Sequence, residues 1–174
     1  MDKIFIEIET KYKTEIDYDD INKCVQVALD LGSDFLCKDS LSISIIDELE
    51  IKKLNKEFLN KNHPTDVLSF PYSSNWSFGI KKNEDKDLFT GGQENYLGDI
   101  FICFKKIKMQ ANDYKISLNL EQNIIIAHGV LHLLGYDHFT KNEEKEMSEK
   151  TVNIIKHLKL DHIKAKLSLE KRNE

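Results

Sequence analysis

Short stretches in which apolar residues alternate with polar ones, or follow one another without interruption, predict β-strands along the first part of the chain. Ile4, Ile6 and Ile8 alternate with polar residues and therefore share one face of an extended segment. The predicted strands span residues 3–10, 41–45, 67–70 and 97–104. We expect them to form a small sheet with helices packed against it.

Longer segments that begin with helix-capping residues predict helices. Asp17 can cap the first helix, and Asp47, followed three residues later by Glu50, begins the second in the manner of a capping box. Thr140 and Glu143 form another capping box before the last helix. The predicted helices span residues 17–31, 47–58, 105–115, 120–134 and 140–158.

This order of elements predicts one α+β domain over residues 1–174, with a small mixed sheet of about four strands packed with about five helices. Residues 72–96 are rich in Ser, Gly, Asn and Lys, which indicates either a flexible insertion or a lid over a site. The lysine-rich residues 161–174 are expected to fray.

The composition is that of a soluble globular protein, with 40% apolar and 32% charged residues. The N-terminus has no basic region followed by an uninterrupted apolar stretch, and no apolar run approaches the roughly 20 residues of a membrane span. The three cysteines form no C-x-x-C pair and are expected to be core thiols in a reducing compartment. We therefore expect a cytoplasmic protein with no membrane partner.

The charge argues against sequence-independent binding to polyanions, because the formal net charge is −5. Arg172 is the only arginine in the chain. Any contact with nucleic acid should therefore be local and made by lysines, which lack the bidentate geometry of a guanidinium group. Composition alone does not point to RNA.

A histidine-rich segment carries the clearest chemical signal. His128 and His132 are four residues apart, so they differ by only about 40° around a helix axis and can reach one ion from the same face. Gly135 can adopt the left-handed conformation that ends a helix and reverses the chain, which can bring His138 to the same ion. Three protein nitrogens with a fourth position left to water are typical of a catalytic zinc site at the end of a helix.

The spacing of this segment matches the H-E-x-x-H-x-x-G-x-x-H pattern of one class of zinc proteases, with one difference. Gly129 stands where the protease has the glutamate that serves as general base. The geometry for binding an ion is retained, whereas peptidase chemistry lacks its base. The alternative is a chance meeting of surface histidines, and the spacing around a helix stop argues against it.

Three segments, taken in order, resemble a known family. They are Leu54-Asn55 followed by Pro-Thr-Asp-Val-Leu-Ser-Phe-Pro over residues 64–71, Leu-Gly-Asp-Ile over 97–100, and the histidine segment over 128–138. In this order they resemble the YbeY-type endoribonucleases, the bacterial rRNA maturation factors. The glycine after the first histidine separates that family from the zinc proteases.

The resemblance implies a metal-dependent, single-strand-specific endoribonuclease of the cytoplasm. Its family role is maturation of the 3′ end of small-subunit rRNA and ribosome quality control, so the implied partners are this RNA and the ribosome or ribosome-associated proteins. The resemblance also implies one Zn²⁺ per chain on His128, His132 and His138. These histidines would act in catalysis through a zinc-bound water.

Candidate substrate-binding residues lie before the third strand. Thr65 and Asp66 belong to the family signature, and a turn capped by short polar side chains is the alternative interpretation. The family usually carries an arginine, thought to face the RNA backbone, at the position of Leu59, and leucine cannot hold a phosphate. Lys56 or Lys61 could supply a point charge from the same helix end.

The chemistry expected of the site follows from the metal. Zinc lowers the pKa of its bound water from about 15.7 to about 7 and polarises a phosphoryl oxygen. Either the zinc hydroxide attacks phosphorus, or it takes the ribose 2′-OH proton so that this oxygen attacks, and both routes stay open. We interpret Asp137 as an outer acceptor that orients a histidine, with proton transfer as the alternative.

Two other classes of function stay open. The first is a zinc hydrolase of a non-RNA substrate, such as a peptide or a small ester, and the absent glutamate at Gly129 argues against a peptidase. The second is a ribosome-associated assembly factor in which zinc is structural, and Leu59 favours this alternative. Metal-dependent cleavage of RNA would distinguish an endoribonuclease from both.

Overall fold

The computed structural model describes residues 4–33, 40–72 and 96–172. In chain order its elements are β1 (Ile4–Ile8), η1 (Thr10–Tyr12), α1 (Tyr18–Gly32), β2 (Ser40–Ile46), α2 (Glu48–Leu59), β3 (Val67–Pro71), β4 (Tyr96–Cys103), α3 (Phe104–Tyr114), α4 (Leu118–Leu133), α5 (Lys141–His157) and α6 (His162–Arg172). No helix in these ranges is both long and apolar enough to cross a membrane. The loop or lid expected at residues 72–96 lies almost entirely outside the described residues.

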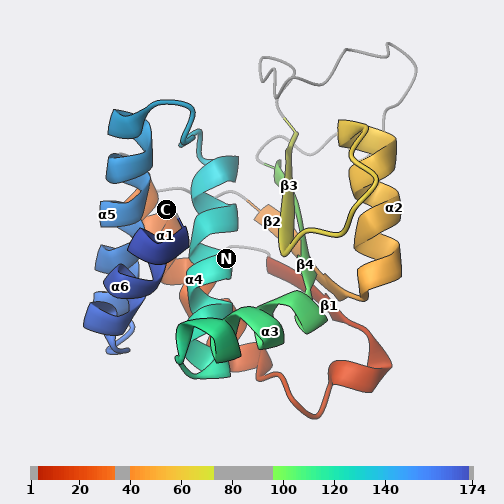
Figure 1. Ribbon diagram of the computed structural model, residues 1–174, viewed down its shortest axis with the longest axis horizontal. Helices are drawn as coiled ribbons and strands as arrows, with labels where there is room; N and C mark the ends of the chain where they lie inside the picture. The colour runs from red at the N-terminus through yellow and green to blue at the C-terminus, as the bar shows by residue number, and fades with distance from the viewer. Residues whose placement is uncertain (1–3, 34–39, 73–95, 173–174) are drawn as a thin grey trace.

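The sheet is mixed, which confirms the predicted α+β fold. Its strands lie in the order β1-β2-β4-β3, with β1–β2 and β2–β4 parallel and β3–β4 antiparallel. Helix α2 lies on one side of the sheet, and α1, α4, α5 and α6 lie on the other (Figure 1). The larger hydrophobic core is on the side of α4, and a smaller core around Ile51 and Leu68 lies beneath α2.

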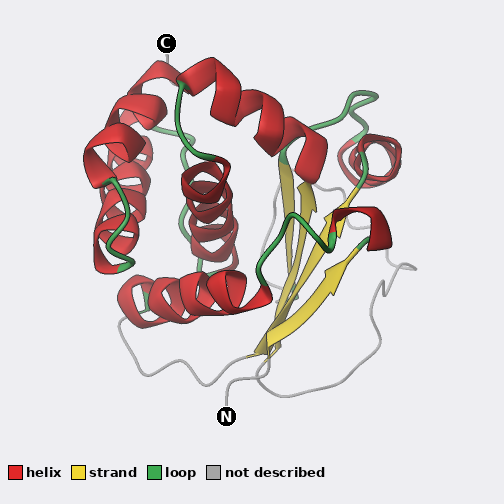
Figure 2. Cartoon of the chain, turned by 90° about the horizontal axis from the view of Figure 1, so that it is seen from below, coloured by secondary structure: helices red, strands yellow, loops and turns green. Residues whose placement is uncertain are grey.

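Helix α4 is the centre of the helical layer. Thirteen of its sixteen residues are buried, so almost every face of the helix meets protein. It contacts β3 and β4 as well as α1, α3, α5 and α6. Figure 2 shows a helix enclosed in this way between the sheet and the other helices. A side chain carried by α4 is therefore held by the core of the protein.

One of the two predicted capping boxes forms between neighbouring residues, whereas the other is completed by a residue that is distant in the sequence. Thr140 and Glu143 form a complete capping box at the start of α5, as predicted. At the start of α2, the Asp47 carboxylate accepts a hydrogen bond from the Glu50 backbone N–H, which is half of the expected box. The Asp47 backbone N–H donates instead to Glu9, 2.8 Å away, which ties α2 to the end of β1.

Within residues 161–174, which were expected to fray, the structure has a helix, α6, that ends at Arg172. Its Ala165 and Leu169, four residues apart, are 0% and 8% exposed and pack into the main core. This burial provides the tertiary contacts that a short helix needs in water. The helical layer therefore contains one more helix than the sequence pattern predicted.

Helix α6 is also joined to α4 by a buried ion pair. The Arg172 guanidinium donates to the carboxylate of Glu121, whose side chain is fully buried. The guanidinium carbon also lies 4.6 Å from the centre of the Tyr114 ring, which is a cation–π contact. The only arginine of the chain thus stabilises a carboxylate that would otherwise be buried without a counter-charge.

The variant Arg172→Ala should lower the free energy of unfolding by about 3 kcal/mol at neutral pH, because it leaves the Glu121 carboxylate buried and unpaired. Burial raises the pKa of Glu121, and Arg172 opposes that rise. Without Arg172 this pKa should lie still further above its unfolded value of about 4.3. The loss of stability should therefore be largest at neutral pH and shrink as the pH falls below about 4, where Glu121 is protonated in both the folded and the unfolded protein.

Urea denaturation of the native protein and the variant at both pH values measures this difference. Lys171→Ala removes an exposed neighbouring cation and serves as the matched control. Equal stability of native protein and Arg172→Ala at neutral pH would contradict the role assigned to the ion pair.

Candidate metal centre

Three histidine side chains converge at the C-terminal end of α4. His128 and His132 lie on successive turns of the helix, and their Nε2 atoms are 3.0 Å apart. His138 comes from the segment between α4 and α5, and one ring nitrogen of each histidine lies within 4.8 Å of the other two. His132 is buried, His128 partly buried and His138 exposed, so the cluster opens to solvent beside His138.

A tight turn at Gly135 brings the third histidine to the other two. Gly135 has a φ of 104°, a conformation that favours glycine, and its N–H donates to the His132 carbonyl at 3.1 Å. The Tyr136 N–H donates to the Leu131 carbonyl at 3.0 Å. The Tyr136 hydroxyl donates to the Gly32 carbonyl at 2.9 Å and so fastens the turn to the end of α1.

The same turn sets the protonation of one imidazole. His132 Nδ1 lies 3.0 Å from the Tyr136 carbonyl oxygen, which can only accept a hydrogen bond. The Nδ1 atom therefore carries the proton, and the lone pair of Nε2 faces His128. The carboxylate of Asp137, which the sequence suggests as an outer acceptor, accepts a hydrogen bond from the His138 backbone N–H at 2.8 Å. A backbone carbonyl thus orients His132.

The electrostatic surroundings keep the two helical histidines uncharged. Burial, reinforced by the neighbouring histidines, holds the pKa of His128 well below its usual range. Burial and His138 lower the pKa of His132 to about 4, although Asp137 and the Tyr136 carbonyl act in the opposite direction. Neutral imidazoles with converging lone pairs are what a metal cation requires, so the cluster can hold a metal ion.

Gly129, which lies between the two histidines, packs closely against the sheet. A Cβ atom at Gly129 would lie 3.0 Å from Ile100 Cγ2 and 3.3 Å from Ser69 Oγ. The Gly129 carbonyl also accepts a hydrogen bond from the Ser69 hydroxyl at 3.3 Å. This position faces the sheet at close contact, and any side chain there would require Ile100 and Ser69 to shift by a few tenths of an ångström.

A cavity of about 240 Å³ lies between the histidines, β3 and the end of α2, and we call it the strand-side cavity. The candidate residues Lys61, Thr65 and Asp66 line it together with the three histidines. Lys56 is exposed on α2 and does not line it. Leu59 also lines this cavity while packing on the small core beneath α2, so one wall is apolar where the resembled family usually has a cation.

Internal hydrogen bonds make the wall of this cavity rigid. Asp66 accepts from the Thr65 hydroxyl and the Val67 N–H through one oxygen, and from Gln110 at 2.9 Å through the other. The buried Asn55 donates to the His63 carbonyl at 2.7 Å and holds the turn after α2. Asp66 therefore lines the cavity and is also the polar cap of its turn.

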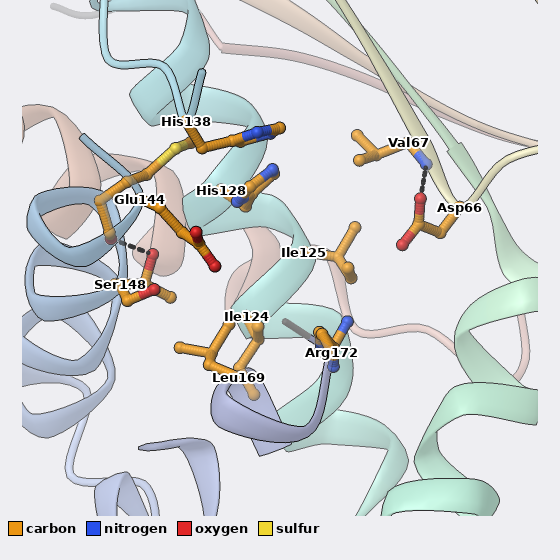
Figure 3. A pocket seen from close by; sticks show the side chains of 12 residues that line it. Asp66, Val67, Ile124, Ile125, His128, His138, Glu144, Ser148, Leu169 and Arg172 are labelled. Carbon is orange, nitrogen blue, oxygen red and sulfur yellow. Dashed lines mark hydrogen bonds between the residues drawn. The ribbon is translucent and has the colours of Figure 1, made fainter. Parts of the chain in front are cut away.

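A second cavity, of about 200 Å³, lies on the other side of His128 and His138, and we call it the helix-side cavity. Its walls come from α4, α5 and α6, and Asp66 lies on its rim towards β3. Glu144 and Arg172 both line it (Figure 3). Neither residue was predicted to lie at a site: Arg172 belongs to α6, which the sequence did not indicate, and the packing of α5 that brings Glu144 to the histidines depends on distant contacts.

Comparison with known proteins identifies a family that matches most of the chain. A family model described as endoribonuclease YbeY matches residues 6–159. The endoribonuclease YbeY of Acetivibrio thermocellus is 43% identical over 122 residues, which cover 70% of this chain and 74% of that protein. The endoribonuclease YbeY of Lachnospira eligens is 36% identical over 168 residues, which cover 89% of this chain and 96% of that protein.

A solved structure supports the fold independently of these names. A solution structure from Thermotoga maritima aligns with a TM-score of 0.52 at 23% sequence identity. The alignment covers 90% of this chain and 91% of the other. At this level of identity the likeness concerns the fold alone.

The native protein should bind one divalent transition-metal ion per chain, and a folded His132→Ala variant should lose it, because two histidines cannot replace a three-ligand site. Elemental analysis after dialysis measures the ion, and circular dichroism confirms that the variant is folded. His157→Ala removes a histidine of α5 outside the cluster and should retain the ion. A folded His132→Ala protein that keeps one ion per chain would contradict the site.

Proposed function

Because this chain belongs to the endoribonuclease YbeY family, we propose that it is a metal-dependent endoribonuclease that cleaves single-stranded RNA. Its proposed role is maturation of the 3′ end of small-subunit rRNA and ribosome quality control in the cytoplasm. The proposed partners are this RNA and the ribosome or proteins associated with it.

One observation carries the metal dependence of the proposal. Three imidazoles, two of them neutral at physiological pH, converge beside a cavity that is open to solvent at His138. Nitrogen donors in a set of three favour zinc with a position left open, so we propose one Zn²⁺ per chain on His128, His132 and His138. When bound, this ion supplies a Lewis acid that polarises a phosphoryl oxygen and acidifies water.

The protein's own residues would position the RNA against this centre. Lys61 is exposed at the wall of the strand-side cavity and provides a positive charge beside the apolar Leu59. Thr65 and Asp66 form the facing rim, held in place by Gln110. We propose that these groups contact the backbone and sugar of the RNA, because ordered polar groups near a reactive centre reduce the entropy cost of orienting the substrate.

Two carboxylates near the histidines that could transfer a proton already accept hydrogen bonds within the protein. Asp66 accepts three hydrogen bonds and Asp137 accepts one from the His138 backbone, so both carboxylates have structural partners. Gly129 offers no side chain between the two helical histidines. This arrangement disfavours a peptidase, whose mechanism needs a glutamate at that point.

The test is cleavage of a single-stranded RNA that carries the precursor 3′ end of small-subunit rRNA. The native protein should cleave it, and His132→Ala should be slower by about a hundredfold or more, because loss of a ligand exceeds the effect of losing an outer-sphere group. His157→Ala, purified in parallel, controls for contaminating nuclease and should cleave like the native protein.

The same RNA annealed to its complement tests strand specificity and should resist cleavage. Equal cleavage by the native protein and by folded His132→Ala would contradict the proposal. Absence of cleavage in all samples would favour a ribosome-associated assembly factor in which the ion is structural.

A further inference from the structure

We propose that the helix-side cavity is a subsite for one nucleobase of the RNA, with a preference for guanine read by the carboxylate of Glu144. This inference rests on the proposed function, because it assigns a further part of the same substrate. It concerns the wall formed by α5 and α6, on the side of the histidines away from α2 (Figure 3).

The position of the cavity suits a nucleotide next to the one that is cleaved. His128 and His138 line both the strand-side and the helix-side cavity, so a strand that crosses the histidines can extend a base into the latter. The cavity of about 200 Å³ is enclosed by protein on several sides, and its lining is shared by three helices. Single-stranded RNA can present a base in this way because its bases are free to unstack.

The lining of the cavity favours a flat apolar ring. Four of its side chains are at most 8% exposed, and they are Ile124, Ile125, Met147 and Leu169. Aromatic bases are bound in proteins by stacking against apolar and aromatic side chains, whereas ribose and phosphate keep their water. The surface that these four residues form therefore suits a base better than a sugar.

The charges of the cavity disfavour a phosphate group. Two carboxylates, those of Asp66 and Glu144, line it. The one guanidinium group, from Arg172, is already paired with the buried carboxylate of Glu121. An anion placed directly against these carboxylates would be repelled by them, whereas the N–H groups of a base would meet acceptors.

Glu144 is the acceptor available to a ligand. Both oxygens of Asp66 already accept hydrogen bonds within the protein. In the described ranges of the chain no hydrogen bond or ion pair engages the Glu144 carboxylate, which points into the cavity between His128 and Ile124 (Figure 3). A carboxylate in this position can accept two parallel hydrogen bonds.

Guanine is the base that matches such an acceptor. Its Watson–Crick edge presents two adjacent donors, the N1–H and the N2 amino group, and each oxygen of a carboxylate can accept one of them. Uracil presents a single donor between two carbonyl acceptors.

Part of this wall lies outside the matched region. Leu169 and Arg172 belong to α6, beyond the residues 6–159 that the family model matches. The preference for one base is therefore inferred from this chain's own contacts, whereas RNA as the substrate comes from the proposed function.

The test uses zinc-loaded protein and oligouridylates that carry one guanosine at different positions. The native protein should cut one bond at a fixed offset from the guanosine, and that bond should move with it. Glu144→Gln keeps the length of the side chain but replaces one acceptor oxygen with a donor. In this variant, cleavage of the bond at the fixed offset from the guanosine should fall about tenfold relative to cleavage between uridines. Glu146→Gln changes an exposed carboxylate on the same helix and should leave the pattern unchanged.

The outcomes separate this inference from the proposed function. A cleavage pattern that ignores the guanosine, or one that is the same in native protein and Glu144→Gln, overturns the subsite while leaving the nuclease in place. If no RNA is cleaved, the proposed nuclease function is wrong, and the binding of nucleotides then tests whether the subsite exists. In NMR titrations guanosine monophosphate should bind the native protein more tightly than uridine monophosphate, and Glu144→Gln should remove the difference. Equal binding of the two nucleotides to the native protein overturns the subsite.

Discussion

The close contact between α4 and the sheet is the constraint on which the rest of the site depends. At Gly129 the helix approaches β4 so nearly that an added Cβ atom would lie 3.0 Å from Ile100. Because protein interiors are packed as densely as organic crystals, α4 cannot rotate or slide without opening a gap in the core. His128 and His132 flank that contact, so the core determines where their imidazoles lie. The residue at this contact is a glycine, so the site lacks the glutamate that a zinc protease has there, and any side chain would press on Ile100 and Ser69.

A second consequence is that the protein's own contacts hold the three histidines together. Tyr136 has three roles at once: its backbone N–H closes the turn, its carbonyl orients His132, and its hydroxyl fastens the turn to α1. Burial keeps the helical histidines neutral, which avoids the repulsion that charged imidazoles would exert on a cation. At the other end of α4, Arg172 compensates the buried Glu121 and holds α6 against the helix. Two cavities meet at the histidines because α4 is enclosed between the sheet and these helices.

Local patterns in the sequence predicted what local interactions determine. The alternation of Ile4, Ile6 and Ile8, the capping box at Thr140 and the spacing of the three histidines each depend on residues a few positions apart. The structure differs from prediction where the partner is distant. The backbone N–H of Asp47 donates to Glu9 rather than to Glu50. Helix α6 is held by contacts with α4, which lies about fifty residues earlier in the chain. The acceptor of His132 was not predicted because it is a backbone carbonyl, which no side-chain pattern marks.

The measurement that tests the central claim most directly is a titration of metal-free protein with zinc, in which bound ion and the rate of single-stranded RNA cleavage are recorded on the same samples. If the three histidines hold the ion at which RNA is cleaved, the rate should rise in proportion to occupancy and level off at one ion per chain. Metal-free protein that cleaves at the full rate would contradict the account. So would a rate that does not change while the histidine site fills.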